Sequence, residues 1–339
     1  MYITVLCKVV DNYGDIGVAW RLCRHLARIQ SQYKICLVVD DFEAFEVVAG
    51  EGVIESEARQ SIIIDGIEIF QWNDAALCHN VFSANDGERL GIILELFQCG
   101  RPDWMERILF EEKLERTVQI IMIDYLTAEK YAEDFHCLQS LTRSAKVKKV
   151  NFMPGFTERT GGLIIDDEWK ELPPYNKDGP VLEFTYKTKC AYLNKQKLPF
   201  MPQTEWDKMM KQCSVLFVRG EESMSRACLS GIPFVWQAYP QSEEYQLVKV
   251  RALLERMRPH FPTQDFEVVE NAWLAINAPH ASSLRGANEV SDEATYDVFL
   301  KNIPRLVPSF QSFAQSLRKN GDLCANLMTF IQKIAIIYE

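Results

Sequence analysis

The sequence predicts an α/β protein of two domains that face each other across a cleft. Apolar runs typical of strands alternate with helical patterns through residues 1–165. A polar segment broken by prolines follows at 166–180, and a second alternation begins near residue 181. Such alternation is typical of βαβ units, whose parallel sheets are covered by helices on both faces.

The first alternation contains several runs of strand length around one clear helical pattern. The expected strands are YITVLCKVV (2–10), KICLVVD (34–40), SIIIDGIEIFQW (61–72), GIILELF (91–97) and VQIIMIDYL (118–126). Between the first two, VAWRLCRHLARIQ has the apolar period of a helix. NFMPGFTERTGGLI (151–164) is rich in glycine and proline, which predicts a loop at the end of this half.

The second alternation starts after the linker at 166–180 and is shorter. Its expected strands are VLEFTYKT (181–188), SVLFVRG (214–220) and IPFVWQAYPQ (232–241), with longer helical stretches from there to the end. In open α/β sheets a ligand sits beyond the carboxyl ends of the strands. The cleft between the two halves is therefore the expected site.

Composition narrows the class of protein. The 339 residues are 47% hydrophobic and 25% charged, which is ordinary for a soluble globular chain of two domains. The formal net charge of −10 disfavours a sequence-independent grip on nucleic acid, whose phosphates require an excess of Lys and Arg. We expect no nucleic-acid partner.

Cysteines and apolar segments indicate the compartment. The 10 cysteines are scattered without a CxxC pair, so we expect buried free thiols rather than a zinc site or a disulfide framework. The start, MYITVLCKVVD, lacks the features of a signal peptide, and no apolar run approaches the ~18 residues of a membrane span. These observations predict a cytoplasmic protein without a membrane partner.

The first candidate site is DNYGDIGVAW, where the first strand gives way to a helix. Gly14 and Gly17 allow a sharp turn, and Asp11 and Asp15 are placed at the carboxyl end of the strand. No Walker A or GxGxxG pattern is present. From the spacing alone, the acids could cap the helix or could bind and catalyse.

The second candidate is SVLFVRGEESMSRACLSG, a strand that ends at Arg219 and Gly220, followed by a helix expected from about Ser223. The free amides at such a helix start suit a diphosphate, and Arg219 could clamp it. Glu221 and Glu222 would repel a diphosphate, so at least one of them should turn to a ribose hydroxyl or a reacting group. The alternative is a capping box whose acids serve only the helix.

The third candidate is aromatic. Phe184 and Tyr186 are expected on one face of a strand, and Phe200 lies in a proline-bracketed loop near Gln203. Such rings could sandwich a planar base, although core packing is an alternative, especially for Phe184. The five histidines show no metal-ligand spacing.

Taken together, these segments resemble one family, the bacterial elongation factor P maturation arginine rhamnosyltransferases, which are GT-B glycosyltransferases. The match runs in order through residues 1 to about 245. The segments that carry it are DNYGDIGVAWRL, LGIILELFQC, IDYLTAEKYAEDFH, NFMPGFTERTGGLI, LPFMPQTEWDKMM and FVRGEESMSRACLSGIPFVWQAYPQ.

The resemblance implies a fold and a reaction. The fold would be GT-B, with an N-terminal Rossmann-like domain for the acceptor (1–165) and a C-terminal one for the nucleotide sugar (181–320). The helix in 321–339 would pack back on the first domain. The enzyme would move L-rhamnose from dTDP-β-L-rhamnose to an arginine of elongation factor P, with inversion and without a metal or other cofactor.

The resemblance also implies residue roles. Asp15 would be the general base, Asp11 its partner in organising the acceptor, and Glu221 a second essential acid. Phe184 and Phe200 would stack on thymine. The remaining substrate-binding residues would be Tyr186, Gln203, Arg219, Glu222, Ser223, Tyr239, Gln241, Asn12 and Gly14.

The chain departs from the family at Glu222, where the usual motif has Asp. Two alternatives stay open at this stage. One is a GT-B enzyme that uses another nucleotide sugar on a small molecule or glycan. The other is a module that binds a nucleotide sugar without transferring it.

Overall fold

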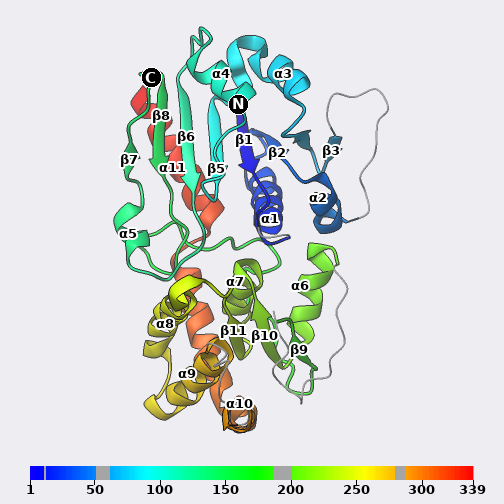
Figure 1. Cartoon of the computed structure of the whole chain (residues 1–339), viewed down its shortest axis with the longest axis vertical. Coiled ribbons are helices and arrows are strands. Elements are labelled where there is room, and N and C mark those ends of the chain that lie inside the picture. Colours follow the sequence, from blue (N-terminus) through cyan, green and yellow to red (C-terminus); the bar gives the residue numbers. More distant parts are fainter. Residues whose placement is uncertain (11–12, 51–61, 186–200, 279–286, 339) are drawn as a thin grey trace.

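The computed structural model describes residues 1–10, 13–50, 62–185, 201–278 and 287–338. In this part of the chain, two sheets lie in separate halves of the molecule, each with helices packed against it (Figure 1). Parallel strands dominate both sheets. The arrangement confirms the predicted α/β class, with two Rossmann-like units facing each other as in GT-B enzymes.

An eight-stranded sheet forms the centre of the N-terminal half, in the order β3-β4-β2-β1-β5-β6-β8-β7. Its strands are β1 (Tyr2–Cys7), β2 (Lys34–Val39), β3 (Ile62–Ile64), β4 (Ile67–Gln71), β5 (Ile92–Leu96), β6 (Val118–Ile123), β7 (Gln139–Ser140) and β8 (Val147–Asn151). Among the described strands of this sheet, the edge pairs β3–β4 and β7–β8 are the antiparallel ones. The order of the chain reverses beside β1 and β5, which is where an open α/β sheet places its ligand crevice.

The run SIIIDGIEIFQW forms two strands instead of the single one expected. Asp65 and Gly66 adopt left-handed φ angles of 53° and 78°, so β3 turns tightly back onto β4. Positive φ at both central residues is what a two-residue hairpin requires, and an Asp-Gly pair supplies it at low cost. The hairpin places one antiparallel strand at the edge of the sheet.

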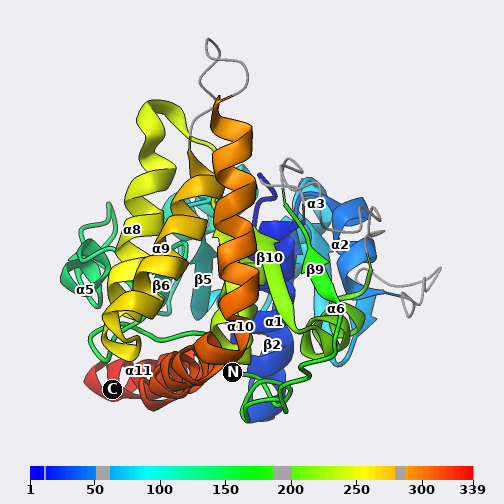
Figure 2. The same cartoon turned by 90° about the horizontal axis from the view of Figure 1, so that it is seen from below.

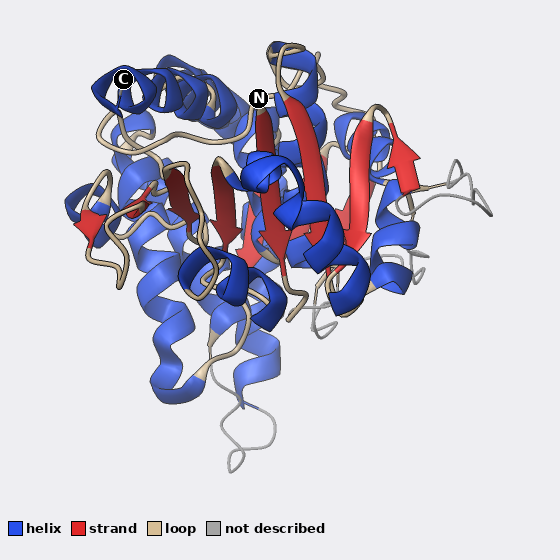
Figure 3. Cartoon of the chain, turned by 90° about the horizontal axis from the view of Figure 1, so that it is seen from above, coloured by secondary structure: helices blue, strands red, loops and turns tan. Residues whose placement is uncertain are grey.

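Helices cover both faces of this sheet, which explains why its strands are almost continuously apolar. The helices are α1 (Gly14–Ile29), α2 (Phe42–Ala49), α3 (Ala75–Gly87), α4 (Asp103–Phe110) and α5 (Tyr131–Phe135). Side chains of α1 and α2 share one apolar core with the sheet, and those of α3 and α4 share another with its opposite face. Figure 3 shows the sheet between these two layers.

The C-terminal half has a smaller, wholly parallel sheet in the order β11-β10-β9. Its strands are β9 (Val181–Glu183), β10 (Val215–Arg219) and β11 (Phe234–Gln237). Its helices are α6 (Gln203–Gln212), α7 (Glu221–Ser230), α8 (Tyr245–Met257), α9 (Thr263–Asn277) and α10 (Ala287–Lys319). Figure 2 shows α8, α9 and α10 side by side. No described helix is both long and apolar enough to cross a membrane.

The last helix, α11 (Leu323–Tyr338), returns to the N-terminal half and lies behind its sheet (Figure 1). Leu327, Met328 and Ile331 are buried in the same core as Trp20 of α1. The chain thus passes between the two halves a second time, after α10.

The TGGL part of the loop 151–164 seats the start of α11. The Leu323 amide donates a hydrogen bond to the Leu163 carbonyl at 2.8 Å. Gly162 has φ 84°, and a Cβ there would lie 2.6 Å from the Gly321 carbonyl oxygen. Any larger residue at this position would push α11 away, so the TGGL motif allows the loop to pack closely against the start of the helix.

A buried group of charges joins the two halves. The side chain of Arg21, on α1, is only 3% exposed and forms ion pairs with three carboxylates, one from the linker and two from the C-terminal half. Its guanidinium holds Asp207 of α6 through two hydrogen bonds of 2.8 and 2.9 Å and Asp166 at 2.6 Å. It also contacts Glu222 in the first turn of α7. We call these four residues the Arg21 cluster.

Two members of the Arg21 cluster, Arg21 and Asp166, stay ionised despite their burial. Burial alone would lower the pKa of Arg21, but Glu222, Asp207 and Asp166 raise it well above its ordinary value. Burial would likewise raise the pKa of Asp166, but Arg21 and Arg226 hold it below its usual range. The charges therefore support one another only while the two halves remain in contact.

Replacing Arg21 should destabilise the protein strongly. Arg21→Met leaves three carboxylates without their shared cation, and breaking a buried ion pair in this way costs about 3–5 kcal/mol. Urea unfolding followed by circular dichroism would measure the change in the free energy of unfolding.

Arg28→Met is the matched control on the same helix. The Arg28 side chain is 49% exposed and lies 4.0 Å from Asp167, so its loss should cost less than about 1 kcal/mol. Equal losses for the two variants would show that the Arg21 cluster does not stabilise the fold.

Candidate active site

The candidate site lies where the carboxyl ends of the N-terminal strands meet the second half. The strand arrows of the large sheet point toward α7 (Figure 1). A small cavity of about 40 Å³ between the two halves is lined from the first by Phe97 and Asp124 and from the second by Glu221, Glu222 and Ser225. The cleft expected from the sequence is therefore lined with acids from both sides.

Asp15 lies in the first turn of α1 and is 3% exposed. Its Oδ2 accepts a hydrogen bond from the Val10 amide at 2.9 Å, so the carboxylate fixes the loop that follows β1. Gly14 opens α1 and is partly buried. Asp11 and Asn12, which are also predicted site residues, lie outside the described residues.

Glu221 is the first residue of α7, one position after Gly220. Its carboxylate is 24% exposed and lies 3.5 Å from the Lys249 ammonium of α8. Burial raises the pKa of Glu221 to about 7; Lys249 opposes this rise, and the negative charges of Asp15 and Asp124 add to it. Glu221 therefore changes charge near neutral pH.

The N-terminus of α7 is open toward the cleft. Gly220 adopts φ 69°, and no side chain of the described residues caps the helix. The Arg219 guanidinium lies over the Phe184 ring, 4.5 Å from its centroid. Free amides with an arginine beside them suit an anionic group such as a diphosphate.

Phe184 directly follows β9, since the strand ends at Glu183 rather than running on as the sequence suggested. The Phe184 amide still donates to the Phe217 carbonyl at 2.7 Å, and its ring meets Trp206 edge to face at 4.8 Å. The structure thus places one predicted base-stacking ring beside Arg219. The other aromatic candidates, Tyr186 and Phe200, lie outside the described residues.

Two residues that were predicted to bind the nucleotide-sugar donor, Gln203 and Glu222, hold the two halves of the molecule together. Glu222 pairs with Arg21, and Gln203 donates from Nε2 to the Gly17 carbonyl at 2.8 Å. Gln203 is also 8% exposed, which leaves little of its surface for a ligand. Sequence reasoning missed this arrangement because Arg21 and Glu222 are 201 positions apart.

The remaining residues predicted to bind the donor differ in their exposure to solvent. Ser223 is buried in the first turn of α7. Tyr239 is 59% exposed, and Gln241 is exposed beyond β11, with its amide donating to Gln246 at 3.1 Å.

Two residues near Glu221 were absent from the sequence-based set, namely Asp124 and Lys249. Asp124 comes directly after β6, at the carboxyl end of a central strand. That position is a usable signal, because parallel strands bring their carboxyl ends to one edge of the sheet. Lys249 gives no comparable signal, since it is one of several charges along α8.

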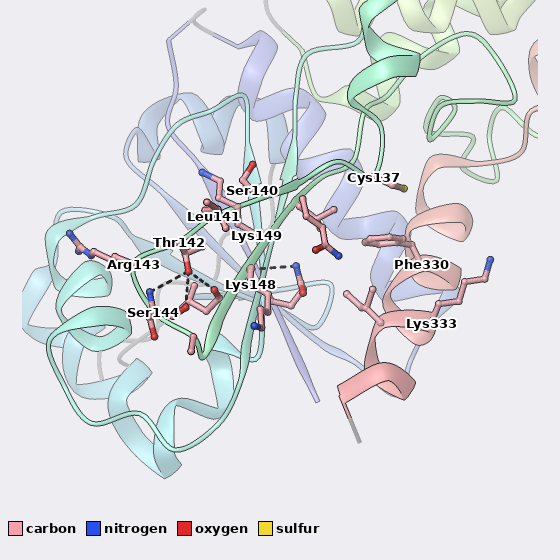
Figure 4. A pocket seen from close by; sticks show the side chains of 16 residues that line it. Cys137, Ser140, Leu141, Thr142, Arg143, Ser144, Lys148, Lys149, Phe330 and Lys333 are labelled. Carbon is pink, nitrogen blue, oxygen red and sulfur yellow. Dashed lines mark hydrogen bonds between the residues drawn. The ribbon is translucent and has the colours of Figure 1, made fainter.

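A larger cavity of about 530 Å³ lies elsewhere, between the β7–β8 edge and α11. Figure 4 shows Thr142, Ser144 and Lys148 on one side of it and Phe330 and Lys333 on the other. It is lined by none of the acids of the cleft. The smaller cavity between the two halves is therefore the candidate active site.

His25, Asp322 and Cys324 are the described residues that could hold a metal ion, since their ligand atoms all lie within 4.8 Å of one another. Both oxygens of Asp322 already accept backbone hydrogen bonds, from Ile165 and Ala325 at 2.8 Å each. Burial, with Asp322 nearby, raises the pKa of the Cys324 thiol well above its usual value. A neutral thiol and an occupied carboxylate indicate a structural contact between α1 and α11.

Comparison with known proteins assigns the chain. The model of the Elongation-Factor P (EF-P) rhamnosyltransferase EarP family matches residues 3–178 and 174–332. A protein-arginine rhamnosyltransferase of Pseudomonas aeruginosa is 27% identical over 391 residues, covering 96% of this chain and 97% of that protein. One of Shewanella oneidensis is 26% identical over 325 residues, covering 74% and 79%.

Among solved structures, one described as the structural basis for EarP-mediated arginine glycosylation of translation elongation factor EF-P is similar. It shares 16% identity and a TM-score of 0.44, and the match covers 98% of this chain and 99% of that one. Since the family model matches nearly the whole sequence, the chain belongs to the Elongation-Factor P (EF-P) rhamnosyltransferase EarP family of glycosyltransferases.

Proposed function

We propose that this protein transfers L-rhamnose from dTDP-β-L-rhamnose to the guanidinium of an arginine on elongation factor P, inverting the anomeric carbon. The acceptor identity is supported by the family description and the reaction by the names of the curated relatives. The observation that carries the proposal is chemical. Carboxylates from both halves border a cleft into which the uncapped start of α7 also opens.

The two sets of groups suit two oppositely charged substrates. A guanidinium has a pKa above 12 and is a poor nucleophile, because its lone pairs are delocalised and it is protonated. Asp15 and Glu221 can hold it by paired hydrogen bonds. The diphosphate of the donor would instead meet Arg219 and the α7 amides, so no metal is needed to neutralise the leaving group.

The reaction then follows from these positions. A guanidinium nitrogen attacks the anomeric carbon of rhamnose as its bond to the diphosphate oxygen breaks. The proton lost by that nitrogen passes to the Asp15 carboxylate, which acts as the general base. The leaving dTDP keeps its electron pair and is stabilised by the donors around α7. Burial of Asp15 keeps its carboxylate dry and oriented by the Val10 amide.

The further donor contacts belong to the same proposal. Phe184, with Tyr186 and Phe200, would hold thymine, whereas Ser223, Tyr239 and Gln241 would lie around the diphosphate and sugar. Asp11 and Asn12 would complete the acceptor side beside Gly14. Gln203 and Glu222 would help the donor by fixing α6 and α7 against α1, in keeping with their contacts to Gly17 and Arg21.

Incubation with elongation factor P and dTDP-rhamnose tests the proposal. Intact-mass analysis should show the gain of one deoxyhexose on the wild-type acceptor, and Asp15→Asn should abolish it because the base is lost. An unchanged acceptor mass, despite tight binding of dTDP-rhamnose, would contradict the proposal and favour another acceptor.

Activity should rise with pH through the titration of Glu221. The pKa of this carboxyl is raised to about 7, so it becomes the ionised, guanidinium-binding form as the pH increases. With one such group, kcat/KM should be about tenfold lower at pH 6 than at its plateau above pH 8. Steady-state rates between pH 5.5 and 8.5 measure this, and Glu221→Gln should give a low, flat profile. A wild-type profile that is flat across pH 7 would argue against the role of Glu221.

Substitutions in the C-terminal half should weaken binding of the sugar donor, whereas substitutions in the N-terminal half should not. Phe184→Ala should weaken dTDP-rhamnose binding by roughly 1–3 kcal/mol, because a stacking partner of the base is lost. Asp15→Asn should leave donor affinity almost unchanged. Isothermal titration calorimetry compares the two, with Phe135→Ala on exposed α5 as the control. The assignment of the two sides would be wrong if Asp15→Asn weakened donor binding more than Phe184→Ala.

A further inference from the structure

Two segments that carry the family resemblance, LGIILELFQC and IDYLTAEKYAEDFH, have no role in the mechanism above. Their strands, β5 and β6, are parallel neighbours paired up to Leu96 and Ile123. The residues that follow these strands, Phe97 and Gln98 on one and Asp124 and Tyr125 on the other, therefore lie side by side. All four are at the carboxyl edge of the sheet, which faces the cleft.

Asp124 is held in a fixed orientation there. Its Oδ2 accepts from the Gln98 side-chain amide at 2.7 Å, and its Oδ1 accepts from the Tyr125 backbone amide at 2.8 Å. The neighbouring residues Phe97 and Tyr125 stack their rings on each other, with centroids 4.5 Å apart and 20° between the ring planes. Each carboxylate oxygen keeps a lone pair that these donors leave unused.

The loop that supplies Gln98 is strained. Phe97 and Gln98 both have a φ of 54°, in the left-handed region that side chains other than glycine rarely enter. Two such residues in succession cost free energy that the rest of the structure must offset, and strain of this kind concentrates at functional sites. Here it places the Gln98 amide on Asp124 and the Phe97 ring against the interdomain cavity.

Asp124 has no cationic partner among the residues that the structure describes. It lines the same cavity as Glu221, which comes from the other half. Glu221 has Lys249 at 3.5 Å, whereas no Lys, Arg or His of the described residues forms an ion pair with Asp124. A partly buried carboxylate that is oriented but unpaired favours an incoming cation, and a guanidinium offers five N–H donors in a rigid plane.

We propose that Asp124 is a third acceptor-binding carboxylate, which pairs with the target guanidinium from the N-terminal side while Glu221 pairs with it from α7. The inference rests on the proposed function, because it takes arginine as the acceptor. Asp15 then takes the proton from the reacting nitrogen, and Asp124 and Glu221 hold N–H groups of the other two. Gln98 is a positioning residue that acts through Asp124.

Asp124 should also influence the titration of Glu221. The charged groups that act on Glu221 are Lys249 from α8, Asp15 from α1 and Asp124 from the end of β6. Removing the negative charge of Asp124 relieves repulsion in the cleft, so the rise of activity with pH should move to lower pH. A residue with a purely structural role would leave this profile in place.

Kinetics on Asp124→Asn test the inference. The variant should raise KM for elongation factor P at least about tenfold, through the loss of a charge-assisted hydrogen bond to the acceptor. Its affinity for dTDP-rhamnose should stay unchanged, and its pH profile should shift to lower pH. Asp124→Glu should recover part of the acceptor affinity, and Gln98→Ala should give a smaller loss than Asp124→Asn.

Glu111→Gln is the control, since it removes an exposed carboxylate just after α4 that does not line the interdomain cavity. It should leave all three readouts as in the wild type. Wild-type values of KM and pH profile for Asp124→Asn would overturn the inference while leaving the proposed function intact. A wild-type protein that neither binds nor modifies elongation factor P would overturn both.

Discussion

The buried guanidinium of Arg21 is the interaction on which the rest of the structure depends. One cation on α1 forms ion pairs with three carboxylates, from the linker, α6 and α7. Because α1 carries Asp15 in its first turn and α7 begins with Glu221, the same contact fixes how the two acids of the cleft face each other. A shift of either helix would separate buried charges and leave each without its partner, which is costly.

The ion pair with Arg21 also gives two neighbouring residues different surroundings. Glu221 and Glu222 are adjacent, yet one faces the cleft with Lys249 and the other is turned to Arg21. The sequence raised the problem of two acids where a diphosphate should bind. The structure pairs one of them, Glu222, with Arg21, so the free amides of α7 face a less negative environment than the sequence suggested.

The general fold was readable from sequence because burial on both faces of a parallel sheet leaves long apolar runs. Features that depend on contacts between residues far apart in the sequence could not be predicted. The β3–β4 hairpin was taken for one strand, since its Asp65-Gly66 turn interrupts the apolar run only briefly. The contacts of Gln203 with Gly17 and of Glu222 with Arg21 could not be predicted, because nothing local in the sequence reveals these partners. Asp124 was missed because a single acid after a strand is common.

The second passage of the chain between the two halves has a consequence for synthesis. The core behind the large sheet includes Leu327, Met328 and Ile331 of α11, which are synthesised after the C-terminal half. The N-terminal half is made first but cannot bury Trp20 and its neighbours fully until the C-terminal half has been completed. A nascent chain would therefore expose this apolar surface until α11 has been made, and truncation within α11 would damage the N-terminal half rather than the half to which the missing residues are nearest in sequence.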